Sequence, residues 1–290
     1  MDVNKKPLIS ILIPAYNQPD YTRECLESVF MQTGFTIDEV EVIMVDDFSP
    51  QDLTNLGMEF ETKYPNFHFE RARNNRGMAG NWNYLLQLKK GKYFIFLSND
   101  DTFATPDALR TTYDALLNNQ ADVCYGKYLC INESNELSDF IPHRKIGNQD
   151  IFWDMYSPQL KRHSISFGWI LYKDFGYLYD VGAGMWADWD YNLQYLANTK
   201  KVLLINTTTL YYRVHSNQGS SGMNYRNYIK ASFYIIWKQT QISDIRKIKL
   251  YCYHVRIMIS TFFIVPKILF FLKKLGLFTI IQSLYKKFHA

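Results

Sequence analysis

The sequence lacks the glycine-rich loops that hold phosphates in two familiar classes of nucleotide-binding protein. Its first predicted strand ends in the turn Pro14-Ala-Tyr-Asn-Gln-Pro19, which contains no glycine, and no GxxxxGK[ST] loop occurs anywhere in the chain. Dinucleotide-binding Rossmann folds and P-loop NTPases both use such glycines to bring the backbone close to phosphate. Both classes are therefore excluded.

Cysteine is scarce as well, and its spacing excludes a common kind of metal site. The 290 residues include four cysteines, which form no CxxC pair and have no histidine cluster beside them. This pattern argues against a zinc site and favours a reducing compartment. No apolar signal segment precedes the first predicted strand, so we expect a cytoplasmic protein.

Acidic residues are missing from the end of the chain. No Asp or Glu follows Asp244, whereas nine Lys and Arg residues do. Because the whole chain has 32 basic and 28 acidic residues, residues 1–244 hold 23 basic against 28 acidic side chains and carry a net charge of −5. The two parts of the chain are therefore expected to face different surroundings.

The apolar runs in this basic end are too short to span a membrane. Residues 257–272 are strongly apolar, but Pro266 and Lys267 interrupt them, which leaves fewer than the roughly 18 uncharged residues of a span. We expect residues 226–290 to form a basic amphipathic helical tail on an anionic membrane surface. The alternative is a helical hairpin that packs on the rest of the chain or on a second copy.

Strands and helices are predicted to alternate over the first hundred residues. Short apolar runs bounded by turns predict buried strands, and apolar residues at helical spacing lie between them. Such alternation is typical of an α/β protein with a Rossmann-like, mostly parallel sheet flanked by helices. The predicted strands are residues 8–13, 40–45, 67–71 and 93–97, and the predicted helices are residues 21–30, a segment opening at Ser49-Pro50, and residues 78–90. Later strands are predicted at residues 121–131 and 202–212.

Polar residues end the fourth of these strands at Ser98-Asn99-Asp100-Asp101. The carboxyl ends of parallel strands form the edge where open α/β sheets bind ligands. Two adjacent carboxylates repel each other, and a hard divalent cation that bridges them to phosphate oxygens relieves that repulsion. A turn that caps the next helix is the alternative interpretation.

Five motifs in order resemble those of the family 2 glycosyltransferases. They are Ser10-Ile-Leu-Ile-Pro-Ala-Tyr-Asn17, Val45-Asp-Asp-Phe-Ser49, Asn74-Asn-Arg-Gly77 with Asn83, residues 97–101, and Ala187-Asp-Trp-Asp190. The resemblance covers residues 8–215 and implies the GT-A fold with a C-terminal helical extension. It divides the chain into a catalytic domain, residues 1–225, and the tail, residues 226–290. Within the domain it implies a nucleotide-sugar half, residues 1–101, and an acceptor half, residues 102–225.

The resemblance also implies which residues bind the donor. Asp47, as the last acid before the serine, would accept a hydrogen bond from the nucleotide base. The alternative is that Asp46 and Asp47 cap the following helix. The implied donor-binding residues are Pro14, Tyr16, Asn17, Asp47, Arg76 and Asp100.

A bound Mn²⁺ or Mg²⁺ is the cofactor that the resemblance implies, with Asp101 and His215 as its ligands. The family often has Asp-x-Asp-Asp where this chain begins with Ser98, which leaves open whether Asp100 or Asp101 is the main metal ligand. His215 lies in Arg213-Val-His215, which resembles the family's late basic loop. Cations there would stabilise the charge that grows on the leaving group.

Asp188 matches the family's general base, which takes the proton of the acceptor hydroxyl. Ala187 replaces the acid that often precedes it, and Asp190 is expected to support the helix. The alternative is that both acids are only N-terminal helix charges. Three tryptophans are expected to form platforms for the acceptor sugar, although a single tryptophan is more often part of the core. They are Trp169, Trp186 and Trp189.

Together these expectations describe a metal-dependent, inverting glycosyltransferase that uses a nucleotide-sugar, with a UDP-sugar expected. It would act on a lipid-linked or growing glycan in surface polysaccharide synthesis, at the inner face of the plasma membrane. We expect no nucleic-acid partner and leave a homo-oligomer open. The alternatives are a sugar-nucleotide-forming nucleotidyltransferase and a non-catalytic protein that binds nucleotide sugar or scaffolds an assembly complex.

Overall fold

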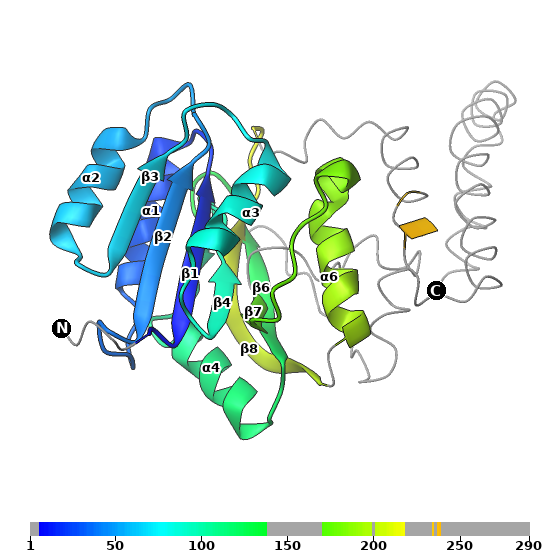
Figure 1. The fold of residues 1–290 in the computed structure, drawn as a ribbon. Coiled ribbons are helices and arrows are strands. Elements are labelled where there is room, and N and C mark those ends of the chain that lie inside the picture. The colour runs from blue at the N-terminus through cyan, green and yellow to red at the C-terminus, as the bar shows by residue number, and fades with distance from the viewer. Residues whose placement is uncertain (1–5, 138–169, 199–200, 218–233, 235–236, 239–290) are drawn as a thin grey trace, which may run out of the picture. The chain divides into compact units, whose positions relative to one another are not determined.

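The computed structural model describes residues 6–137, 170–198, 201–217, 234 and 237–238 (Figure 1). The chain divides into two compact units, Met1–Gly222 and Met223–Ala290, and the sheet and helices named below all belong to the first. Trp169 and almost all of the predicted tail lie outside the described residues, so the tail and its membrane surface remain predictions. No helix within the described part of the chain is long and apolar enough to cross a bilayer.

An eight-stranded mixed sheet forms the centre of the first unit. Its spatial order is β3-β2-β1-β4-β7-β6-β8-β5. The pairs β3-β2, β2-β1, β1-β4 and β6-β8 are parallel, and the pairs that β7 and β5 make are antiparallel. The strands are β1 (Ile9–Ala15), β2 (Val40–Asp46), β3 (Phe67–Arg71), β4 (Tyr93–Phe96), β5 (Thr102–Phe103), β6 (Val123–Ile131), β7 (Ile170–Lys173) and β8 (Val202–Arg213).

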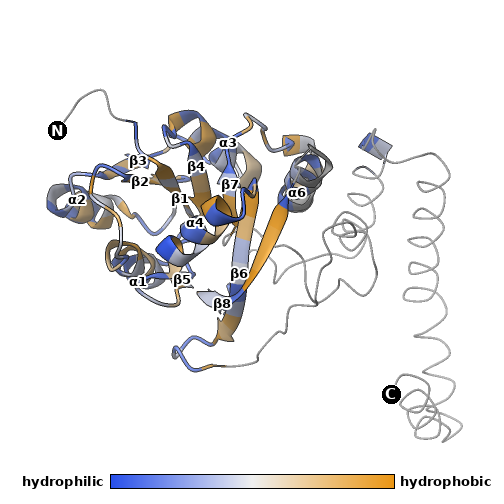
Figure 2. Cartoon of the chain, turned by 90° about the horizontal axis from the view of Figure 1, so that it is seen from below, coloured by the Kyte–Doolittle hydropathy of each residue, from blue (hydrophilic) through white to orange (hydrophobic). Residues whose placement is uncertain are grey.

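Helices cover both faces of this sheet, with α3 and α1 on opposite sides in both views (Figures 1 and 2). The described helices are α1 (Pro19–Phe30), α2 (Thr54–Lys63), α3 (Met78–Leu88), α4 (Ala108–Asn118), the 3₁₀ helix η2 (Val181–Trp186) and α6 (Ala187–Asn198). Hydrophobic residues concentrate along the strands (Figure 2). The predicted alternation of strands and helices over the first hundred residues is confirmed.

The core lies where β1 and β4 run side by side. Leu12, Ile13 and Phe94 are fully buried, and Phe96 is 1% exposed. Aliphatic and aromatic side chains on both faces of a strand are what a sheet covered by helices on each side requires. This burial accounts for the aliphatic and aromatic residues of the two runs. Ser10 of β1 is a buried exception, and its hydroxyl donates to the Glu41 carboxylate.

The predicted start of α2 at Ser49-Pro50 is wrong, because the helix begins at Thr54. The Ser49 backbone N–H donates to Asp46 Oδ1 at 3.0 Å, and its hydroxyl bonds the same oxygen. Ser49 is therefore held in the loop. Asp52 instead accepts the Thr54 N–H at 2.7 Å.

The second half of the sheet brings the late basic residues to the end of β4. β8 runs parallel to β6, and its last residues pair with β5, with Thr102 opposite Tyr211. Because β5 follows Asp101 directly, Arg213 and His215 come to lie beside Asp100 and Asp101. This pairing joins residues more than a hundred positions apart in the sequence.

Candidate nucleotide-sugar site

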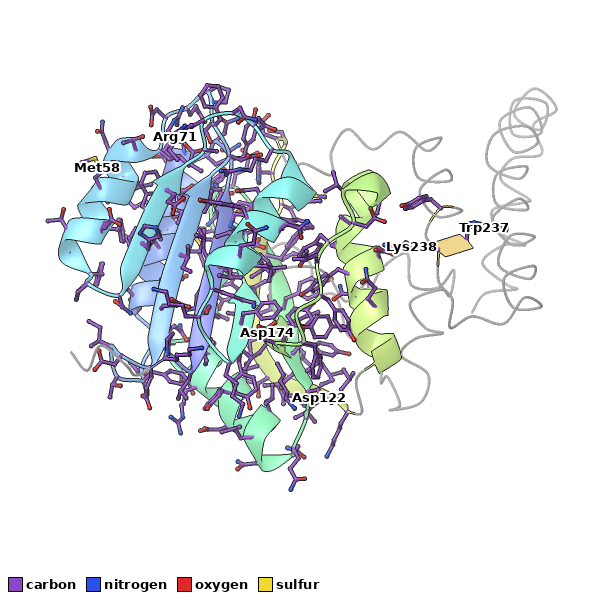
Figure 3. All side chains as sticks on the ribbon, in the orientation of Figure 1. Met58, Arg71, Asp122, Asp174, Trp237 and Lys238 are labelled. Atoms are coloured by element: carbon purple, nitrogen blue, oxygen red, sulfur yellow. The ribbon has the colours of Figure 1, made fainter. Side chains whose placement is uncertain are left out.

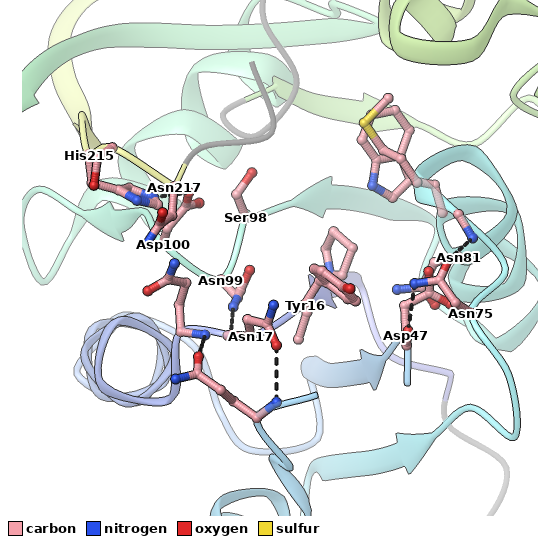
Figure 4. Close-up of a pocket in the computed structure, with 18 residues that line it drawn as sticks. Tyr16, Asn17, Asp47, Asn75, Asn81, Ser98, Asn99, Asp100, His215 and Asn217 are labelled. Carbon is pink, nitrogen blue, oxygen red and sulfur yellow. Dashed lines mark hydrogen bonds and ion pairs between the residues drawn. The ribbon is translucent and has the colours of Figure 1, made fainter. Parts of the chain in front are cut away.

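A cavity of about 980 Å³ opens at the carboxyl ends of β1, β2 and β4 (Figure 4). It lies at the edge of the sheet where the sequence predicts a ligand. Asp47 stands at one end in this view, and Asp100 with His215 at the other. The lining residues are Pro14 to Gln18, Asp47, Gln51, Asn75, Gly77, Met78, Asn81, Trp82, Ser98 to Asp100 and His215 to Asn217.

The loop after β1 is held rigidly at the cavity wall. Asn17 and Gln18 adopt φ angles of 58° and 61°, in the left-handed region that side chains other than glycine seldom occupy. Their backbone N–H groups donate to Ser49 Oγ at 2.7 Å and to Gln51 Oε1 at 3.1 Å. Gln51 N–H donates back to Asn17 Oδ1 at 3.1 Å, and Asn99 donates to the Asn17 carbonyl at 2.9 Å. These bonds fix the loop before any ligand arrives.

Asp46 and Asp47 are neighbours with different surroundings. Asp46 is fully buried, and Ser49 and Arg71 occupy its carboxylate (Arg71 is labelled in Figure 3). Asp47 lines the cavity, and its Oδ1 accepts the Arg76 backbone N–H at 2.7 Å. Burial raises the pKa of Asp47, against the opposing effect of Arg76. Neither acid caps α2, so the capping interpretation is wrong.

Arg76 contributes its backbone, and its side chain is not among those that line the cavity. The guanidinium carbon lies 4.0 Å from the centre of the Tyr84 ring, a cation–π contact. Nη1 is buried without a hydrogen-bond partner among the described residues. A direct donor contact by this side chain therefore remains a prediction, whereas its N–H already orients Asp47.

The opposite end of the cavity carries a carboxylate–imidazole pair. His215 Nε2 lies 3.0 Å from Asp100 Oδ2, and both residues line the cavity. Asp101 does not line it. It is fully buried, with Oδ1 accepting the Arg213 N–H at 3.0 Å and Oδ2 without a partner in the described part of the chain. Burial and the charge of Asp100 raise the pKa of Asp101 well above its usual value.

Arg213 is fully buried and holds the pair in place from behind. Its Nε donates to the Asp100 carbonyl at 3.0 Å, its Nη1 to Asn135 Oδ1 at 2.6 Å and its Nη2 to Glu24 Oε2 at 2.5 Å. Its guanidinium carbon lies 4.4 Å from the centre of the Tyr21 ring, which in turn is 5.2 Å from the His215 ring. Of the two residues predicted from the late basic loop, His215 faces the cavity and Arg213 positions it.

No lysine or arginine is among the described residues that line the cavity. Asp47 and Asp100 leave it with an excess of negative side chains. No group of three His, Cys, Asp or Glu residues in the described ranges is arranged as a complete metal site. Asp100 and His215 offer the oxygen and nitrogen ligands that a divalent metal accepts.

Asp188 lies in the first turn of α6 and is half-buried. Burial raises the pKa of Tyr172 and Tyr179, and the charge of Asp188 adds to both shifts. Asp188 is not among the residues that line the cavity, but the Tyr179 ring packs 4.7 Å from that of Trp82, which does line it. Asp188 therefore lies outside the cavity lining, and its role as base remains a prediction.

The other predicted residues of the acceptor half are less fully described. Asp190 is fully buried and accepts a hydrogen bond from Gln194 at 2.8 Å, as a residue that supports the helix would. Trp186 and Trp189 lie at the start of α6, and their side chains are outside the description. Their role as acceptor platforms, like that of Trp169, remains a prediction.

Several lining residues were not among the predicted site residues, and four of these form side-chain walls of the cavity. They are Gln51, Asn75, Asn81 and Trp82. Asn81 and Trp82 lie four residues after Gly77 and Met78, so the helical spacing of α3 would have placed them on the same side. Gln51 carries no such signal, because its place depends on its reciprocal bonds with the loop after β1.

Comparison with known proteins gives consistent matches. The sequence model described as “Glycosyl transferase family 2” matches residues 10–170. Glycosyltransferase GlyA of Streptococcus pneumoniae serotype 4 is 28% identical over 218 residues, which are 71% of this chain and 30% of GlyA. Poly(ribitol-phosphate) beta-glucosyltransferase of Bacillus spizizenii is 35% identical over 125 residues, which are 43% of this chain and 19% of that protein. The chain thus spans less than a third of either relative.

A solved structure shares the fold. S. aureus TarS 1–349 in complex with UDP-GlcNAc superposes with a TM-score of 0.67 at 17% identity, covering 88% of this chain and 73% of that one. The likeness confirms the predicted GT-A fold of a mixed sheet flanked by helices. The predicted motifs at Ser10, Asp47 and Asp100 all fall within residues 10–170, which the family model matches.

Proposed function

Because the chain belongs to glycosyl transferase family 2, we propose that it transfers a sugar from a nucleotide-sugar to a glycan hydroxyl, with inversion at the anomeric carbon. The observation that carries the proposal is the cavity at the sheet edge. Asp47 lies at one end, where its carboxylate would bind the nucleobase. Asp100 and His215 form a carboxylate–imidazole pair at the other end, where the diphosphate would bind (Figure 4).

The nucleoside would bind between β1 and β2. Asp47 Oδ1 is already held by the Arg76 N–H at 2.7 Å, so the carboxylate is fixed and its other oxygen would accept a ring N–H. Tyr16 lines the cavity and is 48% exposed, which leaves its ring face free for a base. Uracil has one such N–H, and TarS was solved with UDP-GlcNAc. We therefore propose a UDP-sugar as the donor.

The diphosphate would bind at Asp100 and His215. Mn²⁺ or Mg²⁺ bound there would supply the positive charge that the described lining lacks. Asp100 and His215 face the cavity, and the unpartnered Oδ2 of Asp101 keeps this residue as a further ligand candidate behind them. Arg213 fixes this end through the Asp100 carbonyl and the Asp101 carboxylate.

Asp188 would act as the general base. It would take the proton of the acceptor hydroxyl while the hydroxyl oxygen attacks the anomeric carbon. The bond from that carbon to the diphosphate oxygen would break on the opposite face, and the electron pair would leave with the nucleoside diphosphate. A single displacement of this kind inverts the configuration.

We further propose that the acceptor is a lipid-linked or growing glycan of a surface polysaccharide. The support is the likeness to a protein named poly(ribitol-phosphate) beta-glucosyltransferase. The basic end of the chain supports peripheral attachment at the inner face of the plasma membrane, since nine Lys and Arg residues follow Asp244 without an acid. A homo-oligomer stays open.

A second candidate is a non-catalytic protein that binds nucleotide sugar. Ser98 and Ala187 favour it, because each replaces an acid that the family's motifs often carry. The family match leaves the nucleotidyltransferase alternative without support. Binding of UDP-sugars without any turnover would point to the non-catalytic candidate.

A panel of nucleotide sugars incubated with the protein and Mn²⁺ tests the proposal. We expect release of UDP from at least one UDP-sugar and little nucleotide release from GDP- or CMP-sugars. Asp188→Asn should lower turnover by about 10²–10⁴ while UDP still binds. A crippling effect of Asp190→Asn with a nearly silent Asp188→Asn would show that the base has been misassigned.

A further inference from the structure

Asn83 makes an unusual pair of hydrogen bonds across the fold. Its Nδ2 donates to the Tyr179 carbonyl at 2.9 Å, and its Oδ1 accepts the Tyr179 N–H at 2.7 Å, although the two residues are 96 positions apart. A single side-chain amide thus binds both polar groups of one peptide residue, as a neighbouring strand would. Residues 174–180 have no regular secondary structure, so this clamp fixes their backbone at one defined point.

The clamp connects the cavity with α6. Asn83 lies on α3, whose residues Met78, Asn81 and Trp82 line the cavity. Tyr179 immediately precedes Asp180, which caps η2 by accepting the Gly182 N–H at 2.7 Å, and η2 leads directly into α6. The donor-side wall and the start of α6 are therefore joined through one short segment.

Aromatic packing joins Tyr179 to α6, the helix that carries Asp188. The Tyr179 ring stacks on that of Tyr191 with centroids 3.9 Å apart and an interplanar angle of 13°. Tyr191 follows Asp188 by three residues on α6, a spacing that puts both on one side of a helix. The charge of Asp188 also contributes to the raised pKa of Tyr179. Tyr179 thus contacts α3 with its backbone and with its ring, which packs on Trp82, and it contacts α6 through the stack on Tyr191.

We infer that Asn83 is a positioning residue that sets the place of Asp188 relative to a donor bound in the cavity. The inference rests on the proposed role of Asp188 as base. The lining residues of α3 and Asn83 belong to one rigid helix. The contacts to the donor and the position of the base therefore both depend on where this helix lies. A displacement of a reacting group by about 1 Å can cost on the order of 10² in rate, so loss of the clamp affects turnover more than binding.

The test compares Asn83→Ala with Gln87→Ala in the full chain. Gln87 lies one turn further along the same side of α3 and is exposed, which makes it a matched control. One measurement is amide hydrogen exchange at residues 187–191. The others are the Kd of UDP with Mn²⁺ and UDP release from UDP-N-acetylglucosamine with water as acceptor. We expect faster exchange, a Kd within about twofold of the parent and a kcat lowered about 10- to 100-fold for Asn83→Ala, with no change for Gln87→Ala.

A conservative variant separates positioning from general damage. Asn83→Asp keeps the acceptor for the Tyr179 N–H and, when protonated, regains a donor for the Tyr179 carbonyl. Its exchange at residues 187–191 should approach the parent's as pH falls, whereas that of Asn83→Ala should not.

Unchanged exchange in Asn83→Ala, or a UDP affinity that falls as much as turnover, would overturn the inference. Failure of the proposed function looks different. In that case Asp188→Asn leaves turnover intact, or the parent shows none, while the exchange result for Asn83 still decides whether the clamp holds α6.

Discussion

At the scale of single residues, surroundings rather than identity decide what an acid does. Asp46 and Asp47 are adjacent, yet Asp46 is enclosed by Ser49 and Arg71, whereas Asp47 faces the cavity. Asp100 and Asp101 divide in the same way, since only Asp100 lines the cavity. In each pair one acid is enclosed within the fold and the other faces the cavity.

Asp47→Asn should weaken UDP binding by about 10- to 100-fold, the cost of losing a hydrogen bond to a charged group. Calorimetry with Mn²⁺ present measures it. The melting temperature should stay the same or rise, because the raised pKa of Asp47 shows that burial disfavours its charged form. A large loss of stability with unchanged affinity would show that Asp47 is structural.

The raised pKa of Asp47 also predicts how stability and UDP binding depend on pH. A carboxyl whose folded pKa is raised contributes stability below its unfolded pKa, and that contribution is lost as pH rises through the folded value. UDP binding has the opposite pH dependence, because it requires the ionised carboxylate of Asp47. The affinity for UDP should therefore fall on acidification at a pH above 3.8, the ordinary pKa of aspartate. Asp47→Asn should abolish this fall in affinity.

At the scale of elements, the loops after the strands build the site. Gly77, at the start of α3, adopts φ 71° and ψ 165°, a region that only glycine occupies without strain. Its N–H donates to Asn75 Oδ1 at 2.9 Å, and the residue lines the cavity. The turn thus carries the chain from the loop that holds Asp47 into the helix that forms the wall.

Gly77→Ala should lower stability by about 1–3 kcal/mol and also weaken UDP binding, because the strained turn would shift the wall. Gly176→Ala is the control. It has a similar φ of 74° and open space around it but lies outside the cavity lining, so it should cost stability without affecting binding. Urea unfolding and calorimetry measure the two effects. Equal effects of both variants on binding would contradict this account.

The parallel half of the sheet could be predicted from the sequence. Its apolar runs indicate buried strands, and the acids that follow them, Asp47 and Asp100, indicate the edge where the strands end. The sequence did not allow the direction of the Arg76 side chain to be predicted, which depends on Tyr84 eight residues later on α3. The start of α2 was missed because Ser49 bonds Asp46 instead of capping a helix. The burial of Arg213 was also missed, because Glu24 and Tyr21 are far from it in sequence and reach it only through the fold.

At the scale of the whole molecule, charge divides the chain at Asp244. The residues before 245 carry a net charge of −5, and nine basic residues follow without an acid. An anionic membrane attracts each basic residue near its surface by about 1 kcal/mol. Several such contributions together would hold the protein at a membrane without a spanning helix.

The full chain should therefore cosediment with anionic vesicles, less so at high salt and not with neutral ones. A chain that ends at residue 244 should lose this binding but still bind UDP, because its site residues all precede the cut. Replacing Lys273, Lys274, Lys286 and Lys287 by Gln is the matched control that keeps the apolar residues, and it should weaken vesicle binding. Aggregation of the shortened chain, with no vesicle binding by the full one, would assign the tail to a protein interface.

We propose that the cavity binds a nucleoside diphosphate through a cation at Asp100 and His215. Titration of UDP into the full chain, with Mn²⁺ and then with EDTA, tests it most directly. We predict binding with Mn²⁺ that is lost in EDTA and in Asp100→Ala, and retained in Asp114→Asn, a half-buried acid on α4 outside the cavity lining. Equal UDP affinity in Mn²⁺ and in EDTA would contradict the account.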